Sequence, residues 1–443
     1  MRPTLLAPDD LGASRGTGSH KSPRQWPIGD IAVPRLGVEV TWARLEVNSV
    51  PDRSSGERSK MIRTRVSAGK DASVVYRPRR AKDDRQRGSH VLHIAVVCIA
   101  LFSFAGVTGA RAADLKAMWG PAIVNGVSRF PIYEDLGVRI YEEKLPWASI
   151  AERRPRNPRN PNDPAYAWPA EVTQAVAEAK RYHMQVALQI LGAPPWANGG
   201  KPWNWAPIHA QDYANFAIAA AKRYPSVHLW MIWGEPSRTP NFEPETPVKP
   251  FAKLNAQQRL APHIYARILE AAYGALKSVS RSNLVIGGMT YTTGDISTAQ
   301  WIENLRLPDG RPPRLDMYGQ NPFSFRDPNL SNPPSPNQQI DFSDLGRLAA
   351  LVDRYLGRPG NPDPKLFLSE WTIPTMVDEE FDYYVDPPVQ AQWITDGLRI
   401  AQSLPSIYAV GWIHLYDVPP ISYGGLIQTD GTKKAGYFAW KAG

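Results

Sequence analysis

From residue 113 to residue 443 the sequence alternates between short β-rich runs and longer stretches with helical periodicity. The runs are rich in branched and aromatic residues and end at glycine, proline or polar residues, which is typical of strands in a parallel sheet. Helical patterns lie between several of the runs, for example at 169–183, 210–224, 262–280, 343–357 and 388–404. The eight runs are 115–120, 138–143, 184–191, 227–233, 283–289, 314–321, 365–371 and 408–416.

Eight strand–helix units in about 330 residues predict a single (β/α)8 TIM barrel over residues 113–443. An open, doubly wound parallel sheet is the second choice. It is disfavoured because the first strand runs into MWGPAIVNG, which lacks the GxGxxG spacing of a phosphate-binding turn. In a barrel, the residues that follow the carboxyl ends of the strands build the active site.

The first 112 residues differ from the rest of the chain. Residues 1–85 are rich in Arg, Ser and Pro with weak periodicity, so we expect a disordered segment or a leader upstream of the true start. Residues 86–112 contain the apolar run 91–107 after a basic stretch and before an Ala-x-Ala pattern. These are the three regions of a secretory signal. They predict a cleaved signal peptide and therefore a secreted or cell-envelope protein. The alternative is that the apolar run stays uncleaved as a membrane anchor.

The net charge of +9 comes from this N-terminal part. Residues 1–112 hold 19 Lys and Arg against 10 Asp and Glu, whereas residues 113–443 hold 32 of each. The predicted barrel is therefore neutral, without the basic surface of a nucleic-acid-binding protein. The only cysteine, Cys98, precedes the barrel, so neither a disulfide framework nor a cysteine metal site is expected there.

Two carboxylates each follow an apolar strand directly. Glu235 ends the stretch LWMIWGEP, and Glu370 ends KLFLSEW. They are 135 residues apart, but they follow the fourth and seventh predicted strands, which face each other across the mouth of a barrel. A pair of facing carboxylates is what glycoside hydrolysis needs, because one donates a proton to the leaving oxygen and the other stabilises or attacks the sugar. The pair could also be rim residues in structural ion pairs.

Short motifs at these strand ends resemble those of the clan A glycoside hydrolases, the group that contains the family 5 and family 39 (β/α)8-barrel glycosidases. Trp233-Gly234-Glu235-Pro236 resembles the W-N-E-P motif after strand 4, and Ser369-Glu370-Trp371 resembles the nucleophile segment after strand 7. The ending 424–440 is also similar to that of the clan. The resemblance covers about residues 115–443. It implies a retaining mechanism with Glu235 as acid/base and Glu370 as nucleophile.

The resemblance and the loop composition together suggest residues that bind the sugar. Trp412 looks like the clan's tryptophan that forms the floor of the sugar-binding site, and Trp371 follows the predicted nucleophile. By the resemblance, Arg139 on strand 2 would orient Glu370; a structural salt bridge in the barrel interior or at its rim is the alternative. The end of strand 6 supplies Asn321 and, for the missing tyrosine of the clan, Tyr318 or Tyr291. Trp196, in the Trp-rich loop after strand 3, is a candidate stacking platform, although loop packing explains it equally well.

The chain departs from the clan pattern at two positions. Gly234 stands where an asparagine normally hydrogen-bonds the sugar 2-hydroxyl, and Phe323 stands where a tyrosine is usual. The sequence therefore predicts a retaining glycosidase of an extracellular poly- or oligosaccharide, with two alternatives. One is a catalytically inactive polysaccharide-binding barrel, and the other is a transglycosylase that uses the same glutamates. No metal site and no cofactor are expected, because the histidines are scattered without metal-binding spacing.

Overall fold

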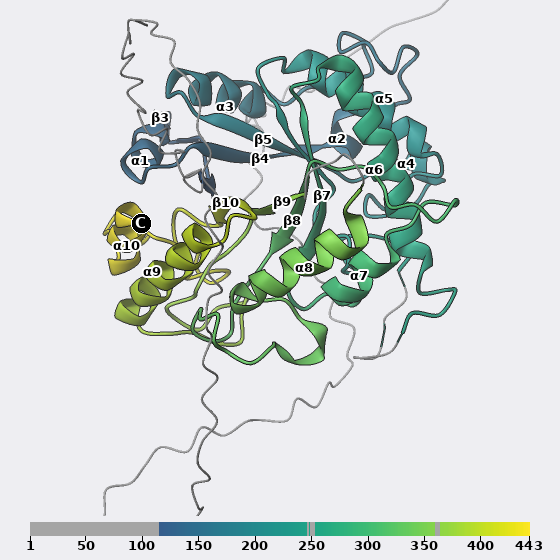
Figure 1. Ribbon diagram of the computed structural model, residues 1–443. Coiled ribbons are helices and arrows are strands. Elements are labelled where there is room, and N and C mark those ends of the chain that lie inside the picture. Colours follow the sequence, from purple (N-terminus) through teal and green to yellow (C-terminus); the bar gives the residue numbers. More distant parts are fainter. Residues whose placement is uncertain (1–114, 246–247, 249–252, 359–363) are drawn as a thin grey trace, which may run out of the picture. The chain divides into compact units, whose positions relative to one another are not determined.

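The computed structural model describes residues 115–245, 248, 253–358 and 364–443. Eight parallel strands close into a barrel in the order β1-β10-β9-β8-β7-β6-β5-β4 (Figure 1). The ring is closed because β1 pairs with β10 on one side and with β4 on the other, which excludes the open sheet. All eight predicted strands are confirmed. The barrel strands are β1 (Leu115–Trp119), β4 (Ile140–Pro146), β5 (Gln185–Leu191), β6 (Leu229–Ile232), β7 (Leu284–Tyr291), β8 (Met317–Asn321), β9 (Lys365–Leu368) and β10 (Ile407–Trp412).

Helices cover the outside of this ring (Figure 1). All five predicted helical segments form, as α3 (Ala170–Arg181), α5 (Ala210–Arg223), α6 (Leu260–Val279), α8 (Leu345–Leu356) and α9 (Pro387–Ser403). The shorter elements carry no clear pattern in the sequence and were not predicted; they include the hairpin β2 (Ile123–Val124) and β3 (Val127–Ser128). The short helices are α1 (Phe130–Asp135), α2 (Trp147–Ile150), α4 (Pro195–Asn198), α7 (Thr298–Asn304), α10 (Ala435–Ala442), η1 (Pro336–Gln338) and η2 (Phe342–Asp344).

The core has two layers, and each strand contributes alternate residues to them, because successive side chains of a strand point to opposite faces. One cluster fills the barrel interior with residues such as Ala117, Met231 and Phe367. A larger cluster packs between the strands and the helices and includes Trp230 and Leu366. The position of a strand residue in this alternation therefore decides whether its side chain can reach the mouth of the barrel.

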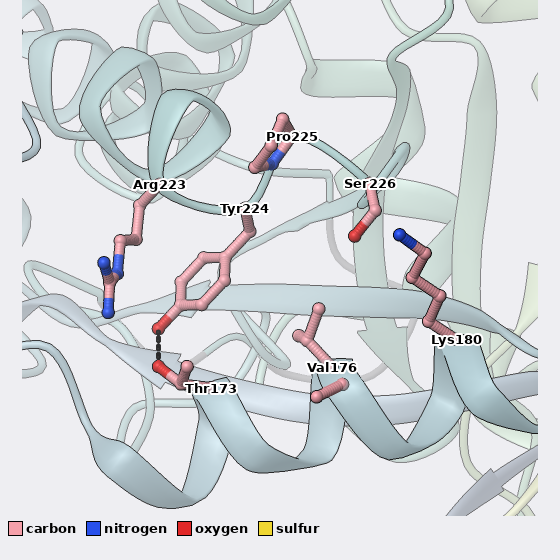
Figure 2. A pocket seen from close by; sticks show the side chains of 8 residues that line it. Thr173, Val176, Lys180, Arg223, Tyr224, Pro225 and Ser226 are labelled. Carbon is pink, nitrogen blue, oxygen red and sulfur yellow. Dashed lines mark hydrogen bonds between the residues drawn. The ribbon is translucent and has the colours of Figure 1, made fainter.

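A groove lies at the opposite end from the mouth, where the chain enters the strands. It is formed by α3 and by the segment that joins α5 to β6, and Tyr224 hydrogen-bonds Thr173 across it at 3.4 Å (Figure 2). None of the predicted site residues lines it, and no acidic side chain does so either. This groove is therefore separate from the candidate active site.

The predicted leader (1–85) and the signal-like segment (86–112) lie outside the described residues. Within the described part of the chain, no helix combines the length and the apolar character that a membrane crossing requires.

Candidate active site

Glu235 lies on a tightly turned segment just beyond β6. Trp233 and Glu235 both have positive φ angles, 65° and 45°, in the left-handed region that residues with a side chain rarely adopt. The turn is held by buried contacts: the indole of Trp233 donates to the Asn241 carbonyl at 2.7 Å and packs edge-on against Phe242. Such strain is maintained where the surroundings enforce it, and it gathers at functional sites. Here it fixes the direction in which the Glu235 side chain leaves the strand.

Three donors surround the carboxylate of Glu235, which is only 8% exposed. Arg238 donates to Oε2 at 2.5 Å and Asn241 donates to the same oxygen at 3.0 Å. Asn321, the last residue of β8, donates to Oε1 at 2.9 Å. The arrangement suits an ionised carboxylate, because all three groups donate to it. Asn321 thus lies beside Glu235, the predicted acid, and its amide nitrogen is hydrogen-bonded to that carboxylate.

Glu370, two residues beyond β9, has a different environment. Among the described residues, none hydrogen-bonds its carboxylate, which is partly buried. Burial, followed by the negative charge of Glu235, raises the pKa of Glu370 to about 8, and Lys144 and Arg238 oppose this shift. The mutual repulsion indicates that the two carboxylates act on each other across the mouth. Near neutral pH, the unliganded site therefore favours the protonated form of Glu370.

A buried polar layer lies beneath Glu370. Ser369 points into the barrel and donates to Oε2 of Glu142 at 2.6 Å, while the indole of Trp119 donates to Ser369 at 3.1 Å. Glu142 is 1% exposed and its other oxygen has no hydrogen-bond partner among the described residues. Burial raises the pKa of Glu142 well above its usual range, and the charge of Glu370 adds to the rise, while Ser369 opposes it. Glu142 is thus favoured in its neutral form.

The prediction for Arg139 is wrong. Arg139 precedes the first residue of β4 and is exposed, so it lies at the end of the barrel away from the mouth. Ile140 faces the interior, and the alternation places Glu142 and Lys144 on the same inner face, farther toward the mouth. Lys144, on this second barrel strand, is one of two residues whose positive charge acts on Glu370, and Arg238 is the other.

Three aromatic predictions are also wrong, because these side chains point outward from the barrel. Tyr318 is fully buried between strands and helices and its hydroxyl is hydrogen-bonded to Thr290 at 2.8 Å. Trp371 and Trp412 are fully buried in the same layer and pack against each other with ring centroids 5.3 Å apart. None of the three has a surface that a sugar could contact.

Trp196 lies in α4, in the loop region beyond β5, which is on the side of the mouth. Its indole donates to the Ala151 carbonyl at 2.6 Å, and the guanidinium of Arg154 lies 4.7 Å above its ring. These contacts fit the loop-packing interpretation, and a role for Trp196 in substrate binding stays a prediction.

On the other side of Glu235, Tyr291 ends β7 and supports Arg238, whose guanidinium lies 4.5 Å above the tyrosine ring. Beyond it, His414 is 2.9 Å from Glu380, with Nε2 facing the carboxylate. Burial alone would raise the pKa of Glu380, but the hydrogen bond and charge of His414, together with contributions from Ser422 and Arg238, lower it. Glu380 also acts on Glu370 by charge, so this pair belongs to the surroundings of the site.

Sequence reasoning missed Trp119, Lys144, Arg238 and Asn241 as members of the site. The first two point inward near the carboxyl ends of their strands, which is a signal once the strand register is known. Within the described residues, no group of three or more His, Cys, Asp or Glu side chains is arranged to hold a metal ion.

No protein-family model matches the sequence, and no curated protein matches it either. The fold, in contrast, is similar to solved glycosidase structures. A family 39 glycoside hydrolase from Bacteroides cellulosilyticus WH2 aligns with a TM-score of 0.52 and 14% identity over 75% of this chain and 64% of its own. A glucosidase from Croceicoccus marinus aligns with a TM-score of 0.52 and 13% identity over 74% and 65%.

A monomeric β-xylosidase from Caulobacter crescentus CB15 gives a TM-score of 0.51 and 15% identity over 75% of this chain and 67% of its own. The match thus spans less than two thirds of the first two chains. At these identities the likeness establishes the barrel fold, and it confirms the expected resemblance to family 39 at the level of that fold.

Proposed function

We propose that this protein is a retaining glycoside hydrolase of a poly- or oligosaccharide, with Glu235 as acid/base and Glu370 as nucleophile. The observation that carries the proposal is the pair of carboxylates beyond β6 and β9: the charge of Glu235 raises the pKa of Glu370, and hydrogen-bond donors hold Glu235 at the mouth. The motifs around them and the fold of the solved neighbours support the same chemistry. Secretion through residues 86–112 remains a prediction that accompanies this proposal.

The proposed mechanism requires a proton on Glu235 and a charge on Glu370, whereas burial in the unliganded site favours a proton on Glu370. The two forms contain the same number of protons, so they belong to one macroscopic state of the pair. The transition state selects the reactive form, because the positive charge that develops on the sugar ring there is stabilised by an ionised Glu370. Glu235 then protonates the leaving oxygen while Glu370 bonds to the anomeric carbon. In the second step Glu235 removes a proton from water, which displaces Glu370.

The charge distribution of the unliganded site also favours one alternative, in which Glu370 is the acid and Glu235 the nucleophile. Three donors stabilise a carboxylate at 235, whereas burial stabilises a protonated group at 370. The motif resemblance favours the first assignment, because it places the nucleophile after strand 7.

The pH profile tests whether the pair acts with one shared proton. We expect kcat/KM to fall as the pH rises above about 8, because the pair then loses the proton that the leaving group needs. The full-length protein is assayed with 4-nitrophenyl glycosides, beginning with both anomers of the glucoside and with the β-xyloside, which the names of two solved neighbours suggest.

Two variants sharpen this test. Arg238→Gln and Lys144→Gln each remove a positive charge that lowers the pKa of Glu370, so the alkaline limb should move to higher pH. Lys180→Gln, in the groove at the other end of the barrel, is the matched control and should leave the limb in place. If the alkaline limb of kcat/KM stays at the same pH in both Arg238→Gln and Lys144→Gln, the shared-proton mechanism is contradicted. A protein that binds polysaccharide but cleaves no glycoside supports the inactive-barrel alternative instead.

A further inference from the structure

The side chain of Gln189 is a buried amide that lacks a complete set of partners. It is the fifth residue of β5 and points into the barrel, since Ala187, two residues earlier, belongs to the interior cluster. Only 2% of Gln189 is exposed, and its Nε2 has no hydrogen-bond partner among the described residues. Amide groups that are buried in proteins are nearly always hydrogen-bonded, so an unpaired donor in this position calls for an explanation.

The amide of Gln189 lies against the backbone that carries Glu235. A β-carbon built on Gly234 would lie 2.9 Å from Oε1 and 3.2 Å from Nε2 of Gln189. In the strand register, Gln189 is paired with Lys144 on one side and with Met231 on the other. The amide therefore occupies the space beside residue 234 that any larger residue there would fill. The absence of a side chain at position 234 and the presence of the amide are two parts of one arrangement.

Other polar atoms at this end of the barrel are unpaired as well. Oε1 of Glu142 and Oδ1 of Asn321 are buried without a partner among the described residues, although the opposite atoms of both groups are hydrogen-bonded. Asn321 ends β8 and donates to Glu235, and Glu142 lies on β4 and accepts from Ser369, the residue before Glu370. Unpaired donors and acceptors are costly inside a protein, and a ligand rich in hydroxyl groups supplies both kinds of partner.

We propose that Gln189 donates a hydrogen bond to the 2-hydroxyl of the sugar bound between Glu235 and Glu370, and that Gly234 leaves the room for it. The inference rests on the proposed function. Two observations favour the 2-hydroxyl over the other hydroxyls of the sugar. It is bonded to the carbon next to the reacting one, and the Gln189 amide lies against Gly234, the residue that precedes Glu235. Hydrogen bonds to this hydroxyl strengthen in the transition state of glycoside cleavage, so Gln189 should contribute more to kcat than to KM.

The test compares Gln189→Met with the unchanged full-length protein on a 4-nitrophenyl glycoside and on its 2-deoxy counterpart. Methionine keeps the volume of glutamine but removes the donor. We expect kcat/KM for the 2-hydroxy substrate to fall by about 10- to 100-fold, mainly through kcat, and that for the 2-deoxy substrate to stay within about threefold. Thermal unfolding of both proteins shows whether the variant is folded.

A second pair of variants, one single and one double, moves the amide from position 189 to position 234. Gly234→Asn alone should lose activity, because its β-carbon meets the amide of Gln189. In Gln189→Ala/Gly234→Asn the space is vacated and an amide returns from the neighbouring position, so activity and preference for the 2-hydroxyl should be partly restored.

The outcomes separate the two proposals. Equal losses on both substrates, together with no restoration in the double variant, overturn the role of Gln189 and leave the glycosidase proposal intact. An unchanged protein that hydrolyses no substrate of the panel overturns the proposed function, and this inference falls with it.

Discussion

Glu370→Gln is expected to lose hydrolysis of the best aryl glycoside by on the order of 10⁵-fold or more, as is typical when a nucleophile is removed from a covalent mechanism. Glutamine has the size of glutamate, and Glu370 forms no hydrogen bond to the described residues, so the fold should be retained. The reason for the loss is chemical: an amide does not form the glycosyl intermediate. Initial rates on the full-length protein measure the loss, and thermal unfolding checks the fold.

A smaller side chain at the same position distinguishes the two assignments of the glutamates. In Glu370→Gly, added azide fits where the carboxylate was and attacks the anomeric carbon directly. We expect restored turnover and a glycosyl azide of inverted configuration, identified by NMR. If Glu370 is the acid instead, azide will restore turnover with retention, because the intermediate then forms on Glu235.

Glu235→Ala has the second largest expected effect, and its size should depend on the leaving group. Alkyl glycosides and oligosaccharides have poor leaving groups, so losing the general acid should lower kcat/KM by about 10²- to 10⁴-fold. A 2,4-dinitrophenyl glycoside leaves without a proton, so its first step should be nearly unaffected. Its second step should become slow, because no base then activates water. A burst of dinitrophenol followed by slow turnover is the signature to measure by stopped flow.

Asn241→Ala is the matched control for this variant. It removes one of the three donors to Glu235 but keeps the carboxylate and the ion pair with Arg238. It should reduce activity by about 10-fold or less, with no dependence on the leaving group, which is the scale of one hydrogen bond. If the losses in Glu235→Ala are the same for good and poor leaving groups, residue 235 is not the acid.

The barrel and its pair of glutamates were predictable from sequence for a simple reason. In a parallel barrel, strands are buried on both faces, so they read as continuous apolar runs, and a carboxylate directly after such a run is conspicuous. Glu235 and Glu370 both follow runs of this kind. The end of a strand can therefore be found from composition even when its register is unknown.

The same continuity hides which side chains point inward. In LWMIW every residue is apolar, so the sequence carries no alternation that separates the interior from the helix layer. The family resemblance and the nearby strand ends place Trp371, Trp412 and Tyr318 in the predicted site, yet all three lie in the outer layer. A shift of one residue moves a side chain from one face to the other, so this error follows from the period of the strand.

Contacts made by loop turns were also beyond sequence reasoning. Arg238 and Asn241 reach Glu235 only because the segment after β6 turns back on itself, with positive φ angles at Trp233 and Glu235. Nothing in the spacing of these residues signals that turn. Gln189 was missed for a related reason, since its importance arises from the space next to Gly234, on a different strand.

The measurement that tests the central claim most directly is covalent trapping of the full-length protein. A panel of 2-fluoro glycosides with activated leaving groups is incubated with the protein, and intact mass and peptide mapping locate any adduct. The proposed mechanism predicts one sugar per chain, bonded to Glu370, and no adduct in Glu370→Gln. An adduct on Glu235, or rapid cleavage of glycosides with inversion and without any adduct, would contradict it.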